Sequence, residues 1–245
     1  VAPRRVDARV LLARLYARTA NLSGAVTELQ QAHADAPHRL DIALDLTQYL
    51  QDLGEVERAA RQLEGVVADV ASDDTVHGAR AAALLARQGR VEDAIAMLEK
   101  LERGTDENAG LLLANLYRRR GRIAQASAVY EGLLRHPSAS TVELAADFYG
   151  AEGDHARAAS TLALLDDLPL KPGTADLVRA SYDVRHGTPA EAIARLAEAA
   201  RRVGSNELLW QNLLTLKVRL SEQEGLADLV AEAAAACPHD AGLRE

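Results

Sequence analysis

A frame of small and apolar residues recurs along the chain at intervals of 32 to 35 residues. One copy spans residues 111–137, LLLANLYRRRGRIAQASAVYEGLLRHP, where apolar or small side chains lie three and four residues apart on both sides of Gly121. The small residue in the second half of the frame recurs at Ala25, Ala59, Ala94, Ala126, Ala158 and Ala192, with Leu226 in the seventh slot. Because so short a unit cannot bury an apolar face alone, the period predicts repeats that stack against one another.

Each copy predicts two helices joined by a tight turn, since spacings of three and four residues place side chains on one face of an α-helix. A left-handed cap conformation costs glycine least, so we expect it after the first helices at Gly54, Gly89, Gly121, Gly153 and Gly187. Capping boxes, in which a Ser or Thr precedes a Glu by three residues, predict helix starts at 140–143, 188–191 and 221–224.

The composition favours helices over strands. Apolar residues make up 48% of the chain, but aromatic residues make up only 3%. Alanine is the best helix former, whereas strands favour β-branched and aromatic side chains. A core of alanine and leucine therefore indicates closely packed helices, and we expect an all-α fold.

The recurring frame resembles the tetratricopeptide repeat, which has a period of about 34 residues and the pattern W-x2-L-G-x2-Y, then A-x3-F, then P. In the copy at 111–137 the frame is Leu113-Ala114, Tyr117, Gly121, Ala126, Tyr130 and Pro137. The resemblance covers the whole chain and implies a right-handed α-solenoid of about seven helix–turn–helix repeats in a single domain, residues 1–245. We expect repeats near residues 6–39, 40–73, 75–106, 107–138, 139–172, 173–206 and 207–240. Asp183 and Lys217 depart from the pattern, because Tyr or Leu is expected there.

The array looks cut at both ends. The chain begins with Val1 rather than Met, and residues 239–243 resemble the start of an eighth first helix. We therefore expect a piece of a larger protein. Arg outnumbers Lys by 25 to 3, which together with the alanine content indicates a GC-rich bacterial gene.

No motif for catalysis, metal binding or cofactor binding is present in the sequence. The seven histidines are scattered and lack a metal-ligand spacing, and no phosphate loop or dinucleotide fingerprint occurs. Cys237 has His239 nearby but no third orienting group, and a lone cysteine excludes an internal disulfide. The net charge of −8 argues against nucleic-acid binding, and no apolar run approaches a membrane span. We expect no enzyme, no metal and no cofactor.

The resemblance nominates binding residues by register. In tetratricopeptide arrays the first helices line an inner groove that holds extended or helical peptides. The corresponding positions here are Arg14, Arg18, Asp41, Asp45, Gln48, Asp52, Arg80, Arg87, Asn108, Asn115, Arg118, Arg119, Glu143, Asp147, Gln211, Asn212 and Arg219. The set of Lys, Asn and Arg that grips a C-terminal carboxylate in some chaperone-binding arrays is incomplete, so that function is not expected.

Two parts of this set carry concentrated charge. Asp41, Asp45, Gln48 and Asp52 share one helical stripe, where three like charges repel each other. A cationic partner or the arginines of the neighbouring repeats would relieve the repulsion, and a solvated helix face is the simpler alternative. The run 118–122, RRRGR, suits the negative end of a helix dipole, and alternatively forms a receptor for an acidic peptide or polymer.

The sequence thus predicts a non-catalytic scaffold that binds a partner protein or peptide in its groove. Tetratricopeptide arrays in bacterial exopolysaccharide secretion and protein sorting look similar, which suggests an envelope or periplasmic setting and a lipoprotein parent. A cytoplasmic regulatory or sensor module is one alternative, and direct binding of an acidic polysaccharide through arginines is another. The sequence alone leaves the compartment open.

Overall fold

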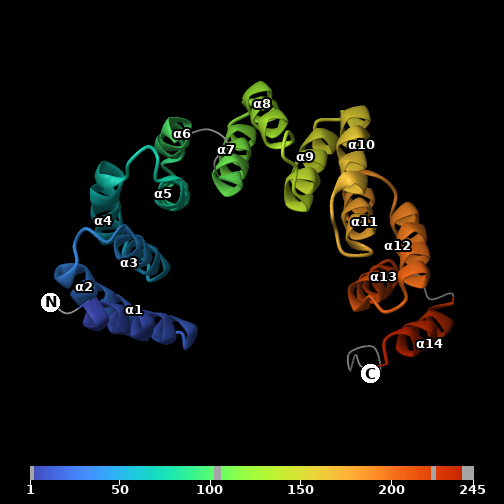
Figure 1. The fold of residues 1–245 in the computed structure, drawn as a ribbon, viewed down its shortest axis with the longest axis horizontal. Coiled ribbons are helices and arrows are strands. Elements are labelled where there is room, and N and C mark those ends of the chain that lie inside the picture. Colours follow the sequence, from blue (N-terminus) through green and yellow to red (C-terminus); the bar gives the residue numbers. More distant parts are fainter. Residues whose placement is uncertain (1–2, 102–105, 222–224, 239–245) are drawn as a thin grey trace. The chain divides into compact units, whose positions relative to one another are not determined.

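The computed structural model describes residues 3–101, 106–221 and 225–238, and within these ranges it contains α-helices, one short 3-10 helix and no strand (Figure 1). The helices are α1 (Pro3–Arg18), α2 (Leu22–Asp35), α3 (Leu40–Asp52), α4 (Val56–Asp69), α5 (Thr75–Arg87), α6 (Val91–Lys100), α7 (Glu107–Arg119), α8 (Ile123–Leu133), α9 (Ala139–Ala151), α10 (His155–Ala163), η1 (Leu164–Asp167), α11 (Thr174–His186), α12 (Pro189–Val203), α13 (Glu207–Arg219) and α14 (Leu226–Ala236). The expected all-α fold of helical repeats is confirmed.

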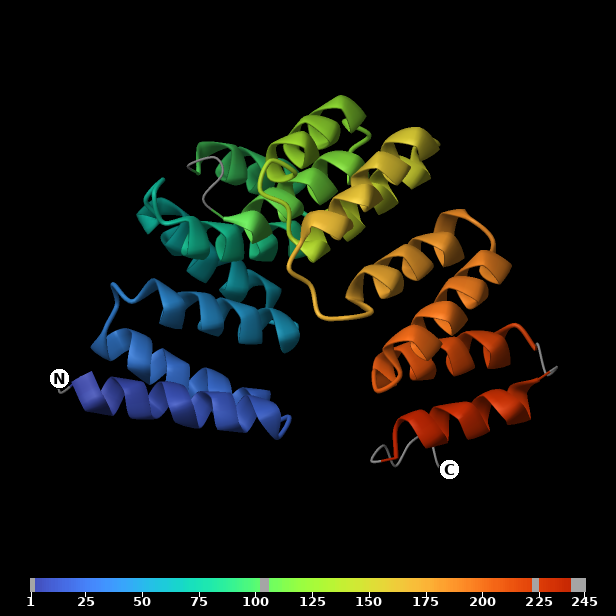
Figure 2. The same cartoon turned by 45° about the vertical axis from the view of Figure 1, so that its right-hand side comes forward.

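Consecutive helices pack in pairs, one pair to each copy of the frame (Figure 2). The small residue of the frame is buried in each of the first six helix pairs. The side chains of Ala25, Ala59, Ala94, Ala126, Ala158 and Ala192 are all 0% exposed. A larger side chain at any of these positions would force the helices apart, because protein cores are close-packed. Leu226, in the seventh slot, is the first residue of α14 and is only half-buried.

The chain divides into two compact units, residues 1–133 and residues 134–245. Unit 1 contains α1 to α8, with α3, α5 and α7 packed side by side as an inner row and α2, α4, α6 and α8 outside it (Figure 1). Unit 2 contains α9 to α14, where α9 packs against α11 and α12 packs against α13. We describe each unit by itself, and a single solenoid over residues 1–245 stays a prediction.

The core of each unit is mostly aliphatic. Leu29, Leu63 and Leu116 are among the buried side chains of unit 1. Unit 2 adds Phe148 and Trp210, which are 2% exposed. Asp183, which departs from the repeat pattern, is accommodated because its carboxylate accepts a hydrogen bond of 2.8 Å from Arg195 Nε of α12.

The expected left-handed caps are confirmed at four of the five glycines. The φ angles of Gly54, Gly89, Gly121 and Gly153 are 78°, 79°, 71° and 78°. The expectation is wrong for Gly187, whose φ is −108°. Glycine is needed there for space, because a Cβ would lie 3.2 Å from the backbone of Asp183. Ala20 takes the equivalent slot after α1 with φ 58°, a conformation that costs a non-glycine residue about 1–2 kcal/mol.

The predicted helix starts have mixed outcomes. The box at 188–191 is confirmed, with Thr188 and Glu191 capping each other's backbone N–H groups. The box at 140–143 is wrong, because the cap lies two residues earlier, at Ser138, which accepts a hydrogen bond from the N–H of Thr141 at 3.0 Å. Residues 222–224 of the third box and the eighth helix expected at 239–243 lie outside the described ranges.

Candidate functional site

The predicted groove residues all lie on the first helices of their repeats. α1 carries Arg14 and Arg18, α3 carries the aspartate stripe with Gln48, α5 carries Arg80 and Arg87, and α7 carries Asn108, Asn115, Arg118 and Arg119. In unit 2, α9 carries Glu143 and Asp147, and α13 carries Gln211, Asn212 and Arg219. The contacts within each unit sort them into residues held by neighbouring helices and residues that are left exposed.

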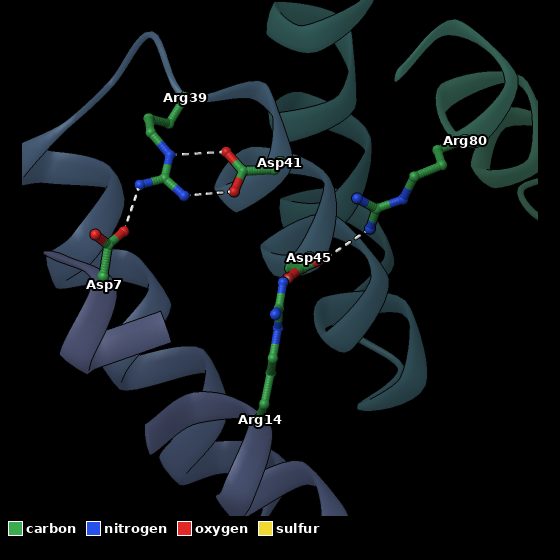
Figure 3. A network of polar contacts seen from close by, with 6 residues as sticks. All are labelled: Asp7, Arg14, Arg39, Asp41, Asp45 and Arg80. Atoms are coloured by element: carbon green, nitrogen blue, oxygen red, sulfur yellow. Dashed lines mark hydrogen bonds and ion pairs between the residues drawn. The ribbon is translucent and has the colours of Figure 1, made fainter. Parts of the chain in front are cut away.

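Asp45 joins three first helices of unit 1 (Figure 3). One carboxylate oxygen accepts a hydrogen bond of 3.3 Å from Arg14 Nη2 of α1, and the other accepts one of 2.5 Å from Arg80 Nη2 of α5. The Asp45 side chain is only 12% exposed. Charge-assisted hydrogen bonds to a shielded carboxylate are stronger than those at a fully exposed one, so Asp45 fixes α3 between its two neighbours.

A second ion pair joins α3 and α5 two turns further along. We call this pair and the Asp45–Arg80 pair rungs. Asp52 Oδ1 accepts a hydrogen bond of 2.5 Å from Arg87 Nη2. Asp45 and Asp52 are seven residues apart on α3, as Arg80 and Arg87 are on α5, so each helix presents both groups on one face. We call these four residues, together with Arg14, the first-helix ladder.

Asp41 is held by a residue that the sequence analysis missed. Arg39 donates from Nε and Nη2 to the two oxygens of Asp41 at 2.9 and 2.6 Å, and from Nη1 to Asp7 of α1 at 2.7 Å (Figure 3). Hydrogen bonding from Arg39 is the main reason that the pKa of Asp41 lies below its ordinary value, and burial opposes it. The arginines of this unit therefore relieve the repulsion in the aspartate stripe, which needs no cationic ligand.

The basic run 118–122 is divided between two roles. Arg120 Nε and Arg122 Nη2 donate to the two oxygens of Glu92 in α6 at 2.8 and 2.7 Å. Both hydrogen bonds lower the pKa of Glu92, and the one from Arg120 contributes most. Within residues 3–101, 106–221 and 225–238, no ion pair or side-chain hydrogen bond engages Arg118 or Arg119. Arg119 is exposed and Arg118 is half-buried, so these two arginines are available to a partner.

The predicted acidic residues of unit 2 are also engaged by the next first helix. Arg185 of α11 donates to Glu143 at 3.2 Å, and its Nε lies 3.1 Å from Asp147 Oδ1. His186 Nε2 lies 2.8 Å from the same oxygen of Asp147, and the hydroxyl of Ser181 donates to Glu143 at 3.3 Å. Like the ladder, this cluster ties two neighbouring first helices together.

A hollow of about 260 Å³ lies between α11 and α13. Its floor is apolar and includes Leu196 of α12 and Leu216 of α13, which are 3% and 4% exposed. Its walls carry polar groups, namely Ser181, Arg185, Asn212, Thr215 and Arg219. Asn212 and Arg219 were predicted from the sequence, whereas Arg185 was not. Gln211 lies exposed on α13 and is not among the lining residues.

The comparisons with known proteins agree with this architecture. No protein-family model and no curated protein matches the sequence. A solved tetratricopeptide repeat protein from Parabacteroides merdae superposes with a TM-score of 0.53 at 14% identity, covering 98% of this chain and 96% of that chain. A Podospora anserina putative kinesin light chain with nearly identical TPR-like repeats gives 0.56 at 22% identity, covering 74% and 97%.

The chain has the tetratricopeptide-repeat fold. Pseudomonas aeruginosa PilF is a further similar structure, with a TM-score of 0.57 and 19% identity over 86% of this chain and 97% of that chain. The resemblance noted in the sequence is therefore confirmed for the fold. None of the described helices of this tetratricopeptide-repeat chain is both long and apolar enough to cross a bilayer.

The missed residues share one cause. Arg39, Arg185 and His186 each meet an acid 32 to 39 residues away in the sequence. In a tetratricopeptide fold that separation joins adjacent first helices, so pairing every charge with those about one repeat away would have found them. The sequence pattern pointed to arginines of the neighbouring repeats as a group, without pairing individual charges.

Proposed function

We propose that this chain is a non-catalytic scaffold that binds a partner protein or peptide on the first-helix faces of its tetratricopeptide units. The α11–α13 hollow carries the proposal. An apolar floor with a few polar groups on the walls is the usual composition of a site that accepts a side chain of a ligand. Its volume of about 260 Å³ is of the size that one large side chain fills.

The two groups of first-helix residues have different roles in this proposal. Ladder residues such as Asp45 and Arg80 hold neighbouring helices and set the spacing of the face. Contacts to the partner come from residues outside those pairs. In unit 1 these are Arg18, Gln48, Asn108, Asn115, Arg118 and Arg119, and in unit 2 they are Gln211, Asn212 and Arg219.

Arg118 and Arg119 favour a second candidate function, direct binding of an acidic polysaccharide. Two neighbouring arginines without an acidic partner in the described residues attract a polyanion of either kind. A protein partner and a polymer differ in the salt dependence of binding, because a polyanion releases bound counterions.

The cellular setting is part of the proposal and rests on composition and resemblance. We propose a bacterial envelope system such as exopolysaccharide secretion or protein sorting, with a cytoplasmic regulatory module as the alternative. The parent chain distinguishes them, since a lipoprotein signal before Val1 supports the envelope and a kinase or DNA-binding domain supports the regulator.

The test is affinity capture with residues 1–245 from a lysate of the source organism at low and moderate salt. Two variants are compared with the original, Arg118→Glu/Arg119→Glu and Arg219→Glu. Lys100→Glu and Lys171→Glu, which reverse exposed charges away from these faces, serve as matched controls. We expect one protein that the controls retain and that at least one groove variant loses.

Two outcomes contradict this proposal. A protein retained equally by all variants binds outside the proposed first-helix faces. An acidic glycan retained by the original, lost by Arg118→Glu/Arg119→Glu and released steeply by salt makes the chain a polymer binder.

A further inference from the structure

A second hollow lies in unit 1, in the layer formed by the second helices of the repeats. It has a volume of about 390 Å³ and is flanked by α2 and α4, the second helices of the first two repeats. Its floor includes Leu46 and Leu50, one turn apart on α3 and 3% and 2% exposed. At about 100° per residue, these leucines lie on the side of α3 away from Asp45 and Asp52. The α2–α4 hollow is therefore separate from the first-helix ladder.

The walls of the α2–α4 hollow are basic and polar. Arg58, Arg61 and Gln62 share one face of α4, and Gln30 and His33 share the facing side of α2. No carboxylate is among the described residues that line it. Arg58 is paired with Glu55 one turn earlier.

Arg61 is the cation that remains for a ligand. No ion pair or side-chain hydrogen bond engages it in the part of the chain that the structure describes, and its side chain is exposed. An arginine offers a planar fork of donors that matches a carboxylate.

His33 adds a polar atom without a partner. Its Nε2 lies 3.2 Å from the amide nitrogen of Gln62, so the amide donates and the neutral ring carries its proton on Nδ1. That Nδ1 is buried and has no hydrogen-bond partner among the described residues. Burial lowers the pKa of His33. The charged groups that share its hollow are Arg58 and Arg61 of α4, while α3 contributes only leucines.

The basic pattern is not part of the repeat frame. Counted from the small residue of each second helix, the positions of Gln30, His33, Arg58 and Arg61 are taken one repeat later by Glu64, Val67, Asp93 and Ala96. The same places one repeat later, on α4 and α6, are thus acidic or apolar. Stacking of the repeats therefore does not require these cations.

We propose that the α2–α4 hollow binds a Glu or Asp side chain from an acidic segment of a partner protein. The carboxylate pairs with Arg61 and lies beside His33, and the aliphatic part of the segment packs on Ala34, which is exposed at the hollow. Ala34 and the methylene stems of Arg58 and Arg61 offer apolar surface beside the cations, which a protein segment covers and a free phosphate does not. This surface is additional to the first-helix faces of the proposed function.

The direct test is fluorescence anisotropy of the full chain with a labelled hexapeptide of alternating Leu and Glu, against the same peptide with Gln for Glu. We expect the Glu peptide to bind at least about tenfold more tightly than the Gln peptide, and Arg61→Glu to weaken it by about tenfold or more. Lys100→Glu, an equal charge reversal on the exposed side of α6, is expected to change the affinity by less than about twofold. Inorganic phosphate at about ten times the peptide concentration is expected not to compete.

His33 gives a second readout that a general electrostatic effect would not produce. A carboxylate beside the ring favours its protonated form, so saturating peptide raises the pKa of His33 measured by NMR. By linkage, the Glu peptide binds more tightly as the pH falls through that pKa.

The results that overturn the proposal are equally specific. The proposal is wrong if Arg61→Glu and the milder Arg61→Gln bind the Glu peptide as tightly as the original does. Circular dichroism and the melting temperature of both variants must be unchanged for this comparison. Absence of binding up to about 1 mM peptide also overturns it. Loss of binding in Arg118→Glu/Arg119→Glu with Arg61→Glu unaffected would place acidic segments on α7 instead. Competition by phosphate equal to that of the peptide would make the hollow an anion site.

Discussion

The α3–α5 pair of unit 1 and the α11–α13 pair of unit 2 carry different charges at the same slot of the repeat frame. Seven residues before the small residue of each second helix, unit 1 has Asp52 on α3 and Arg87 on α5. These opposite charges form a rung of 2.5 Å. In unit 2 the slot holds Arg185 on α11 and Arg219 on α13, and a hollow lies between those helices.

The slot fourteen residues before the small residue shows the same contrast. In unit 1 it holds Asp45 and Arg80, which form the other rung. In unit 2 it holds Val178 on α11 and Asn212 on α13, which cannot form an ion pair. Two like charges at one slot and none at the other leave α11 and α13 without a rung. The frame therefore places the helices, and the charges at these two slots decide which neighbouring first helices are joined by rungs.

The largest effect is expected from reversing the charge at the centre of a rung in unit 1. Asp45→Arg removes the carboxylate shared by Arg14 and Arg80 and places a third cation between them. We expect a loss of about 2 kcal/mol in the free energy of unfolding, measured by urea titration. Glu198→Arg, an equal reversal on an exposed face of α12, is the control. Equal loss in both variants would show that the rung has no specific role.

Creating an ion pair between α11 and α13 of unit 2 is expected to have a smaller effect. Arg219→Asp places an acid opposite Arg185, as Asp52 is opposite Arg87. We expect a gain of about 0.5 kcal/mol in stability, since Arg185 is already shared with Glu143 and Asp147. The crystal structure of the variant should show the α11–α13 hollow narrowed. An unchanged hollow would mean that α12, and not the charge at this slot, sets the spacing.

The smallest effect is expected from pH. The pKa of Asp41 is lowered in the folded state, so its pairing with Arg39 stabilises the fold fully above the ordinary value near 3.8 and is lost as the pH falls through the lowered value. Both side chains are about one-third exposed, so we expect about 0.5 kcal/mol. The measurement compares urea unfolding of the original and Asp41→Asn at neutral pH and near pH 3. The difference between them should shrink in acid, and a constant difference would contradict the pairing.

Most of the fold follows from local and periodic signals. The alanine slots and the four left-handed glycines report conditions that every repeat must meet, so the sequence pattern identifies them directly. Gly187 was assigned a left-handed conformation because slot position alone does not distinguish a need for positive φ from a need for space. Ser138 was overlooked because the capping box at 140–143 competes with it on the same pattern.

The site was predictable only in part, for a physical reason. The first-helix positions follow from register, but their pairing depends on side chains that reach across helices about one repeat apart. Arg39 pairs with acids on two different helices, and the charge pattern of a single helix does not indicate such a pairing. The α2–α4 hollow was not predicted, because its residues are on second helices and its acidic counterparts one repeat later remove any periodic signal.

The fully buried alanines have a consequence for how such a chain diversifies. Ala25, Ala59 and their equivalents admit almost no change in volume, so mutational freedom is confined to the helix surfaces between them. A substitution that changes a surface charge can add or remove an ion pair between neighbouring first helices without altering these buried alanines. New partners can therefore be acquired one slot at a time, while the chain remains folded throughout.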